Sequence, residues 1–185
     1  MVRRQSAGYT LVELLTVLVI VGILAALLIP GTRPSMQARL ESAAQIVAGD
    51  LAYARSLAIS RNRAFRASFQ VAENRYTVGP ASGLSGSATP LDPFASDRTA
   101  RSGTYVTDLD ELPGVTGVSL YKVAAAGPAG GEYIEFGPYG ETSHAEESVV
   151  WLVGGTGGSE RYVAVRVNPV TGLATVDLNA GGVKP

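Results

Sequence analysis

An apolar segment near the N-terminus limits what this chain can fold into more than any other feature. No ionisable residue occurs between Leu14 and Ile29, and the 21 residues that begin at Tyr9 carry a single charge, on Glu13. An α-helix of about 20 apolar residues is long enough to cross the hydrocarbon core of a membrane. The sequence therefore predicts a membrane-spanning helix over residues 9–29. A carboxylate at membrane depth is costly, so Glu13 predicts a functional site with a cationic partner.

Two simpler interpretations of this segment are a secretory signal peptide and a plain signal anchor. The chain does start with the basic sequence MVRR, as signal peptides do. However, the apolar run is longer than a usual signal peptide, and the sequence LLIPGTRPSM that follows lacks a small-x-small cleavage pattern. The plain anchor stays open. Arginines flank both ends of the run, so their distribution does not give the orientation of the helix.

Length and charge allow one modest globular domain after this segment. The chain has 185 residues with a net charge of −1. Residues 33–66 carry six arginines against two acids, whereas residues 67–185 carry seven cations against 13 acids. A domain with a broad nucleic-acid-binding surface would be basic throughout, so this charge pattern argues against such a surface. Cysteine is absent, so there is no disulfide framework and no thiolate metal site.

The remaining sequence predicts a second helix followed by strands. Pro30 and Pro34 predict a kink or a break, so the continuity of the helix stays open. From Ala64 the pattern changes to alternating apolar and polar residues, in short segments separated by turn formers such as GPYGE and NPVTG. We expect an α+β fold in which a long N-terminal helix packs on an antiparallel β-sheet or sandwich. Apolar residues that predict an amphipathic helix recur at steps of three and four, namely Leu40, Ala44, Val47, Leu51, Ala54 and Ala58.

The sequence RRQSAGYTLVELLTVLVIVGILAALLIP combines a short basic leader ending in Gly8, an aromatic residue, Glu13 and an apolar helix that reaches Pro30. This combination resembles the leader and N-terminal helix of type IV prepilins and pseudopilins. The resemblance implies that a prepilin peptidase cuts between Gly8 and Tyr9 and that the new N-terminus at Tyr9 is methylated. The resulting segments are the leader at 1–8, the membrane helix at 9–29, the amphipathic helix at 30–62 and the globular domain at 63–185, with a mobile loop at 79–104.

The same resemblance supplies a partner for Glu13. Cleavage creates an α-amino group at Tyr9, and in a filament with helices in register the Glu13 carboxylate of one subunit can pair with the amine of a neighbour. Pro30 belongs to the same assembly motif. The implied partners are other pilins, the prepilin peptidase and methyltransferase, and an inner-membrane assembly platform. The implied location is the inner membrane, in a single pass with a cytoplasmic N-terminus and a periplasmic globular domain, before entry into a periplasmic pseudopilus.

The distal half is similar to the GspH/FimT class of minor pseudopilins. The sequences that carry this similarity are DLAYARSLAISRNRAFRASF, IEFGPYGETS, SVVWLV and RYVAVRVNPVTGLATV. The class implies a structural subunit of a type II secretion pseudopilus; the alternative is a minor type IV pilin that binds DNA for competence. In the alternative, Arg61, Arg63 and Arg66 contact nucleic acid. We favour the other interpretation, in which cations at a helix C-terminus complement its dipole, so nucleic-acid binding is not expected.

Other chemistries are weakly supported. The single histidine, His144, lies in the polar sequence ETSHAEES without a nucleophile elbow, so no catalytic site is predicted. Asp108, Asp110 and Glu111 lack the spacing of an EF-hand, so they predict a solvated acidic turn and no metal site. We therefore expect neither an enzyme nor a cofactor.

Overall fold

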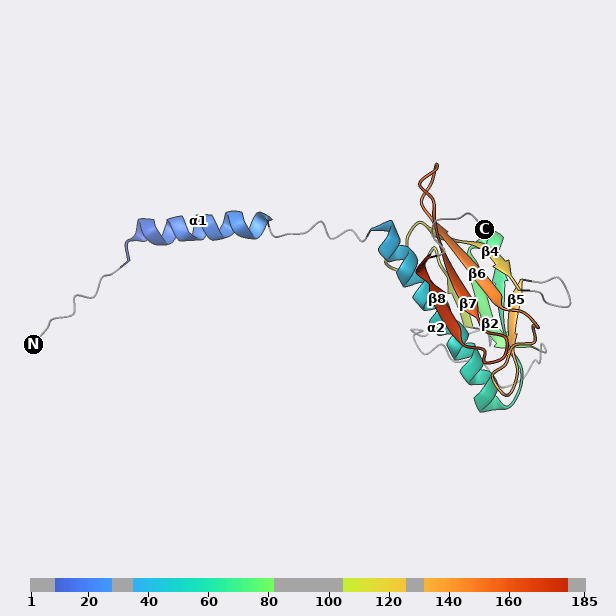
Figure 1. Ribbon diagram of the computed structural model, residues 1–185. Helices are drawn as coiled ribbons and strands as arrows, with labels where there is room; N and C mark the ends of the chain where they lie inside the picture. Colours follow the sequence, from blue (N-terminus) through green and yellow to red (C-terminus); the bar gives the residue numbers. More distant parts are fainter. Residues whose placement is uncertain (1–8, 28–34, 82–104, 126–131, 180–185) are drawn as a thin grey trace, which may run out of the picture. The chain divides into compact units, whose positions relative to one another are not determined.

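The computed structural model describes residues 9–27, 35–81, 105–125 and 132–179, and the chain divides into two units after Arg33 (Figure 1). In the first unit, α1 (Leu11–Leu27) is a 17-residue α-helix. Its sequence is apolar apart from Glu13 and Thr16. The hydroxyl of Thr16 donates a hydrogen bond to the carbonyl of Val12 at 2.8 Å. The hydroxyl of Thr16 is therefore satisfied within the helix, as an apolar environment requires.

None of the helices in the described ranges combines the length and the hydropathy needed to cross a membrane.

In the second unit, α2 (Met36–Arg61) is a 26-residue helix with a clear cap at each end. Ser35 is extended, and its hydroxyl accepts the N–H of Ala38 at 3.2 Å, so the described helix begins one residue later. Asn62 adopts the left-handed conformation with φ of 48° and ends the helix. Of the helix predicted over 30–62, residues 30–34 lie outside the described residues.

Two antiparallel sheets of four strands each follow α2. The strands are β1 (Phe65–Gln70), β2 (Arg75–Pro80), β3 (Tyr105–Asp108), β4 (Val118–Ala124), β5 (Tyr133–Phe136), β6 (Ser148–Gly154), β7 (Arg161–Val167) and β8 (Ala174–Asp177), and the 3-10 turn η1 (Val71–Glu73) follows β1. One sheet has the order β3-β2-β1-β5 and the other β4-β6-β7-β8. Buried and half-buried residues alternate along β1 and β6, so one side of each strand faces the core.

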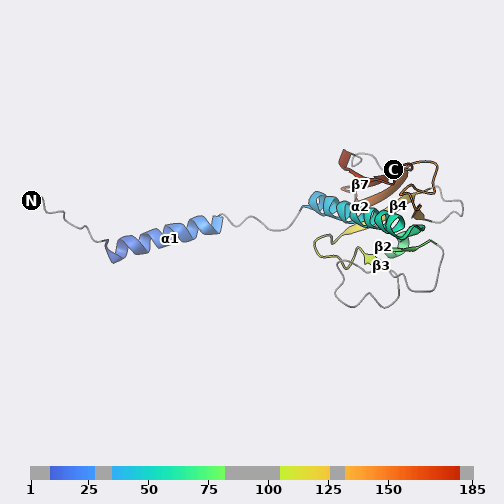
Figure 2. The same ribbon diagram turned by 90° about the horizontal axis from the view of Figure 1, so that it is seen from below.

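The α2 helix packs on both sheets. Seen from below in Figure 2, β7 and β4 lie on one side of the helix and β2 and β3 on the other. The six apolar residues of the predicted stripe are all at most 1% exposed. They pack in one core with side chains from both sheets, including Phe65, Ile134, Leu152 and Val163. Because a fully buried aliphatic side chain contributes about 1.5–3 kcal/mol, this stripe holds the helix on the sheets.

A buried asparagine joins the two sheets. Asn74, between η1 and β2, adopts a left-handed conformation and is 8% exposed. Its side chain donates to the carbonyl of Val118 at 3.1 Å and accepts the N–H of Leu120 at 2.8 Å, so it bonds to β4 like a neighbouring strand. The turn after β1 in one sheet is thereby fixed to an edge strand of the other.

The predicted α+β fold class is confirmed, with a helix on antiparallel sheets. The predicted loop at 79–104 begins too early, because Gly79 and Pro80 pair with Arg66 and Phe65 as the last residues of β2. Residues 82–104 lie outside the described residues.

Candidate assembly site and the junction below α2

The N-terminal end of α1 carries residues predicted to act in processing and assembly. Tyr9 precedes the helix and is 82% exposed. The hydroxyl of Thr10 accepts the N–H of Glu13 at 3.2 Å, an arrangement that belongs to the Thr-x-x-Glu capping box. The Glu13 carboxylate therefore lies in the first turn, near the positive end of the helix dipole. Gly8 and Pro30 lie outside the described residues.

The large apolar side chains of residues 9–24 are exposed among the described residues of the first unit. Twelve large apolar side chains between residues 9 and 24 are each more than half exposed. Soluble monomeric proteins rarely expose a contiguous apolar surface of this kind, so such a surface marks a contact with protein or membrane. The single carboxylate of the segment lies at one end of this surface.

Residue Asp50 is a buried carboxylate in the middle of α2 that the sequence pattern did not single out. It is 8% exposed. It accepts the hydroxyl of Tyr76 at 2.5 Å, that of Tyr105 at 2.9 Å and that of Thr107 at 3.0 Å. These donors lie on β2 and β3, so the carboxylate fixes the helix on one sheet. Such a charge is tolerated in a core only when hydrogen bonds satisfy it.

This cluster makes the stability of the domain depend on alkaline pH. Burial first, and then the charge of Asp50, raise the pKa of Tyr76 well above 10.0. The folded domain therefore keeps a proton that the unfolded chain loses above pH 10.0. We expect the titration of Tyr76 to add no pH dependence to the free energy of unfolding of residues 34–185 below that pH, and to lower this free energy above it by about 1.4 kcal/mol per pH unit. Urea unfolding at pH 8 to 11 measures this slope.

The control for this prediction is Tyr76→Phe, which lacks the titrating group. Its stability should be lower at neutral pH but should fall less steeply above pH 10.0 than that of the unchanged domain. Some slope remains, because the hydrogen bond from Tyr162 to Glu160 raises the pKa of Tyr162 to about 12. Equal slopes for both chains would contradict the role given to Tyr76.

Two turns meet below the C-terminal part of α2. Gly140 follows β5 and Gly172 precedes β8, and both have positive φ angles, of 86° and 63°. A Cβ atom on Gly172 would lie 1.9 Å from the carbonyl oxygen of Gly140, so only glycine fits between the turns. Arg55 on α2 donates to the same carbonyl at 3.3 Å, and Thr142 donates its N–H to the carbonyl of Pro169 at 2.8 Å. These contacts bind the two turns to each other and to the helix.

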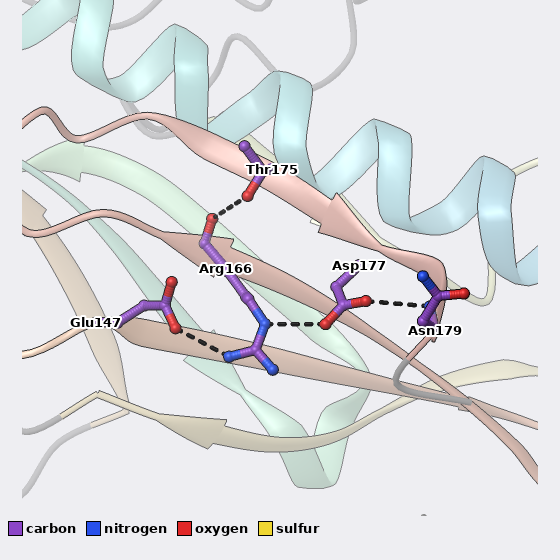
Figure 3. Close-up of polar contacts among 5 residues, drawn as sticks. All are labelled: Glu147, Arg166, Thr175, Asp177 and Asn179. Carbon is purple, nitrogen blue, oxygen red and sulfur yellow. Dashed lines mark hydrogen bonds and ion pairs between the residues drawn. The ribbon is translucent and has the colours of Figure 1, made fainter. Parts of the chain in front are cut away.

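A cluster of polar residues around Arg166 on the second sheet holds the edge strand β8 (Figure 3). Arg166 on β7 donates to Asp177 on β8 at 3.0 Å and to Glu147 at 2.9 Å. The backbone carbonyl of Arg166 accepts the hydroxyl of Thr175 at 3.5 Å. The backbone N–H of Asn179 donates to the Asp177 carboxylate at 3.0 Å. Because the ion pairs are partly exposed, each contributes no more than about 1 kcal/mol. Two carboxylates neutralise this cation, so the cluster serves the sheet edge.

Two protein-family models match this chain, one over its N-terminal segment and one over most of its globular unit. The model described as "Type II transport protein GspH" matches residues 43–172, which is more than two thirds of the chain. The chain belongs to the GspH family. The model described as "Prokaryotic N-terminal methylation motif" matches residues 3–29, which include Gly8, Tyr9, Glu13 and the whole of α1.

Solved structures give a more distant likeness to this GspH-family chain. Two crystal forms of the type IV minor pilin FimU from Pseudomonas aeruginosa are 18% identical to it. Each alignment covers 75% of this chain and 86% or 92% of FimU, with TM-scores of 0.46 and 0.47. None of the curated proteins matches the chain.

The three arginines of the GspH-family chain that were predicted as a nucleic-acid contact do not form one open patch. Arg66 donates to Glu135 at 2.7 Å and lies 4.0 Å above the ring of Tyr133. Arg63 is half-buried, with its guanidinium 5.6 Å from the ring of Phe65. Arg61, in the last turn of α2, is exposed. Two of the three cations are thus used within the domain, and a phosphate backbone would have to compete with Glu135.

The other polar residues that the sequence analysis weighed also have local roles. His144 is 4% exposed, and its Nε2 lies 3.1 Å from the carbonyl oxygen of Tyr133. Asp108 accepts the N–H of Asp110 at 2.9 Å, and Asp110 accepts the side-chain amide of Asn74 at 2.7 Å, as in an acidic turn. Across the described parts of the chain, no group of three or more His, Cys, Asp or Glu is placed to hold a metal ion.

Proposed function

We propose that the chain is a minor pseudopilin, a structural subunit of the pseudopilus of a type II secretion system. The observation that carries this proposal is the presence of both family matches on one chain. A methylation motif lies over an apolar helix with a single carboxylate, and the GspH match lies over a compact domain with its own core. This organisation suits a subunit that is anchored by its helix and presents its domain outside the membrane.

In this proposal a prepilin peptidase removes residues 1–8 on the cytoplasmic side and methylates the new N-terminus at Tyr9. Residues 9–29 then anchor the protein once in the inner membrane, with the globular domain in the periplasm. The exposed apolar surface of α1 supports this role, because lipid and then neighbouring helices would cover it. An assembly platform would collect the subunit into a periplasmic pseudopilus with other pseudopilins.

Glu13 would pair with the amine of a neighbouring subunit in that filament. Its position in the first turn of α1 places it one turn from the N-terminus that cleavage creates. An uncompensated charge in an apolar environment is costly, so each group requires the other. Pro30 would mark the end of the helical segment that stacks in the filament.

We expect Gly8→Ala to block removal of the leader. The peptidase requires a very small residue before the cut, and the sequence SAGYTLVE contains one glycine at that place. The variant should stay in the inner membrane at its precursor mass, whereas the unchanged chain should lose residues 1–8. Mass spectrometry of the membrane fraction separates the two. Ala7→Ser is a matched control one residue earlier and should be processed; mature-mass protein from Gly8→Ala would contradict the prepilin assignment.

A strain that lacks the chain distinguishes type II secretion from pilus or competence functions. The proposal expects folded exoproteins to accumulate in the periplasm and DNA uptake to stay normal. The unchanged chain should restore secretion, and Gly8→Ala should not. Loss of DNA uptake with normal secretion would instead assign the subunit to a competence pilus. The arrangement of Arg63 and Arg66 does not favour that second function.

A further inference from the structure

Each of the two sheets has two edge strands, and the edges at β4 and β5 are closed by other parts of the chain. On β4, the side chain of Asn74 already bonds to one main-chain N–H and one carbonyl. On β5, the N–H of Ser143 donates to the carbonyl of Glu135 at 3.0 Å, and Nε2 of His144 lies 3.1 Å from the carbonyl oxygen of Tyr133. A further strand would have to displace these contacts.

The edge at β3 is protected by burial and by charge. Its inward residues Tyr105 and Thr107 are buried, and both donate hydrogen bonds to Asp50. The last residue of the strand, Asp108, is an acid, and a charged side chain at a sheet edge discourages the pairing of another strand. The core is therefore closed at this edge.

The remaining edge strand, β8, has main-chain groups that face away from its sheet. The N–H of Asn168 donates to the carbonyl of Leu173 at 3.1 Å, so these residues are a hydrogen-bonded pair just before the strand. Hydrogen-bonded and non-bonded pairs alternate between antiparallel strands. The main chain of Thr175 therefore bonds to β7, whereas the N–H and carbonyl groups of Ala174 and Val176 point outward. Within the described ranges, neither of these two residues has a main-chain partner outside the sheet.

The hydrophobic core is also open at this edge. The side chains of Ala174 and Val176 pack against the core but are only half-buried, whereas their cross-strand partners on β7 are 0% exposed. Leu173 and Leu178, on either side of β8, are 55% and 46% exposed. Incompletely covered apolar side chains and outward main-chain groups thus occur together on one strand.

An extended polypeptide matches this combination. The outward groups of Ala174 and Val176 are two residues apart, which is about 7 Å along a strand. An added strand presents its own N–H and carbonyl groups at the same spacing, and alternate side chains would cover the apolar surface. The segment that fits is free of proline, as long as the four residues of β8, and apolar at its inward positions. Lipids and nucleic acids offer no such row of alternating donors and acceptors.

We propose that β8 pairs with an extended segment of a different pseudopilin, which adds a fifth strand to the sheet β4-β6-β7-β8. This inference rests on the proposed function, because a minor subunit has other subunits as its neighbours. Once the segment is bound, the edge is closed and does not recruit a further strand. The contact therefore joins this chain to one neighbour and does not repeat.

A photocrosslinker on β8 tests which protein lies there. The natural chain has no cysteine, so Thr175→Cys in the full-length chain gives one exposed site for a benzophenone maleimide. When all subunits are produced together, illumination of the membranes should join the chain to another pseudopilin, which mass spectrometry identifies. Lys122→Cys, exposed on the closed edge strand β4, is the matched control and should not give the same adduct. An adduct only with a second copy of this chain would overturn the proposed partner.

Proline at position 176 tests whether the main chain makes the contact. Val176→Pro removes one outward N–H but leaves the bonds to β7, and its ring hinders an approaching strand. The adduct from Thr175→Cys should fall about tenfold, because a hydrogen bond is lost and the approach is blocked. Val176→Thr keeps the N–H and the branched shape and should keep the yield. An equal yield with Val176→Pro would overturn strand addition; protease resistance in the same membranes checks that each variant is folded.

Hydrogen exchange of the unchanged chain tests the contact without any substitution. The N–H groups of Ala174 and Val176 should exchange at least about tenfold more slowly in membranes that contain the other pseudopilins than in membranes with this chain alone. Exchange at Thr175, which bonds to β7, should change less. Equal exchange in the two membranes would overturn the added strand, whether or not Val176→Pro folds.

Secretion separates failure of this inference from failure of the proposed function. If secretion requires the chain but β8 shows neither an adduct nor slower exchange, the added strand is wrong and the secretion function stands. If secretion is normal in a strain that lacks the chain, the proposed function is wrong, and the pseudopilin partner is wrong with it.

Discussion

A chain with Glu13→Ala is expected to enter the membrane and to lose its leader, but to fail to join filaments. Removal of the carboxylate leaves the ammonium of a neighbour without a partner in apolar surroundings. Breaking one half of a buried charge pair costs about 3–5 kcal/mol, so assembly should fall at least about 100-fold. Insertion should improve slightly, because a charge has left the apolar segment. Membrane fractionation measures insertion, and crosslinking to other pilins measures assembly in the same strain.

Thr16→Ala is the matched control for this prediction. It also removes a polar group from α1, but the Thr16 hydroxyl bonds within the helix to the carbonyl of Val12, so no subunit contact is lost. This variant should assemble normally. Unchanged crosslinking by Glu13→Ala would contradict the pairing role, and loss of insertion would show that Glu13 serves targeting. The capping contact with Thr10 uses the backbone N–H of Glu13, which alanine keeps.

Those elements that depend on local patterns could be predicted from the sequence. The stripe from Leu40 to Ala58 repeats at helical spacing, and the structure buries every member of it. Phe65, Ala67 and Phe69 alternate with polar residues, and β1 buries them in that order. In both cases the apolar residues repeat in the sequence with the period of the helix or strand that they form. The residues next to one another in sequence are therefore enough to predict the element.

Contacts between distant segments could not be predicted in this way. Asp50 lies on the buried side of α2, three residues after Val47, and a charge at such a position was the available signal. Its donors Tyr76 and Tyr105 are 26 and 55 residues away, and no local pattern links them to it. The same holds for the candidate site, where the role proposed for Glu13 follows from a local motif but the pairing of Arg66 with Glu135 depends on strand register.

The largest stability effect that we predict for the globular unit is that of Gly172→Ala. Alanine at φ of 63° costs about 1–2 kcal/mol, and its Cβ would collide with the carbonyl oxygen of Gly140. The collision partner is backbone, so the two turns must move apart, which typically costs a further 1–3 kcal/mol, or about 3 kcal/mol altogether. The melting temperature of residues 34–185 should fall by roughly 10 °C. Urea and thermal unfolding measure both quantities.

Gly157→Ala separates backbone strain from the collision. Gly157 has nearly the same φ, 64°, but no atom lies within 4 Å of its added Cβ. This variant should lose only the cost of the left-handed conformation, about 1–2 kcal/mol. The difference between the two variants therefore measures the packing of the turns. Equal losses would show that the two turns can move apart at little cost in stability.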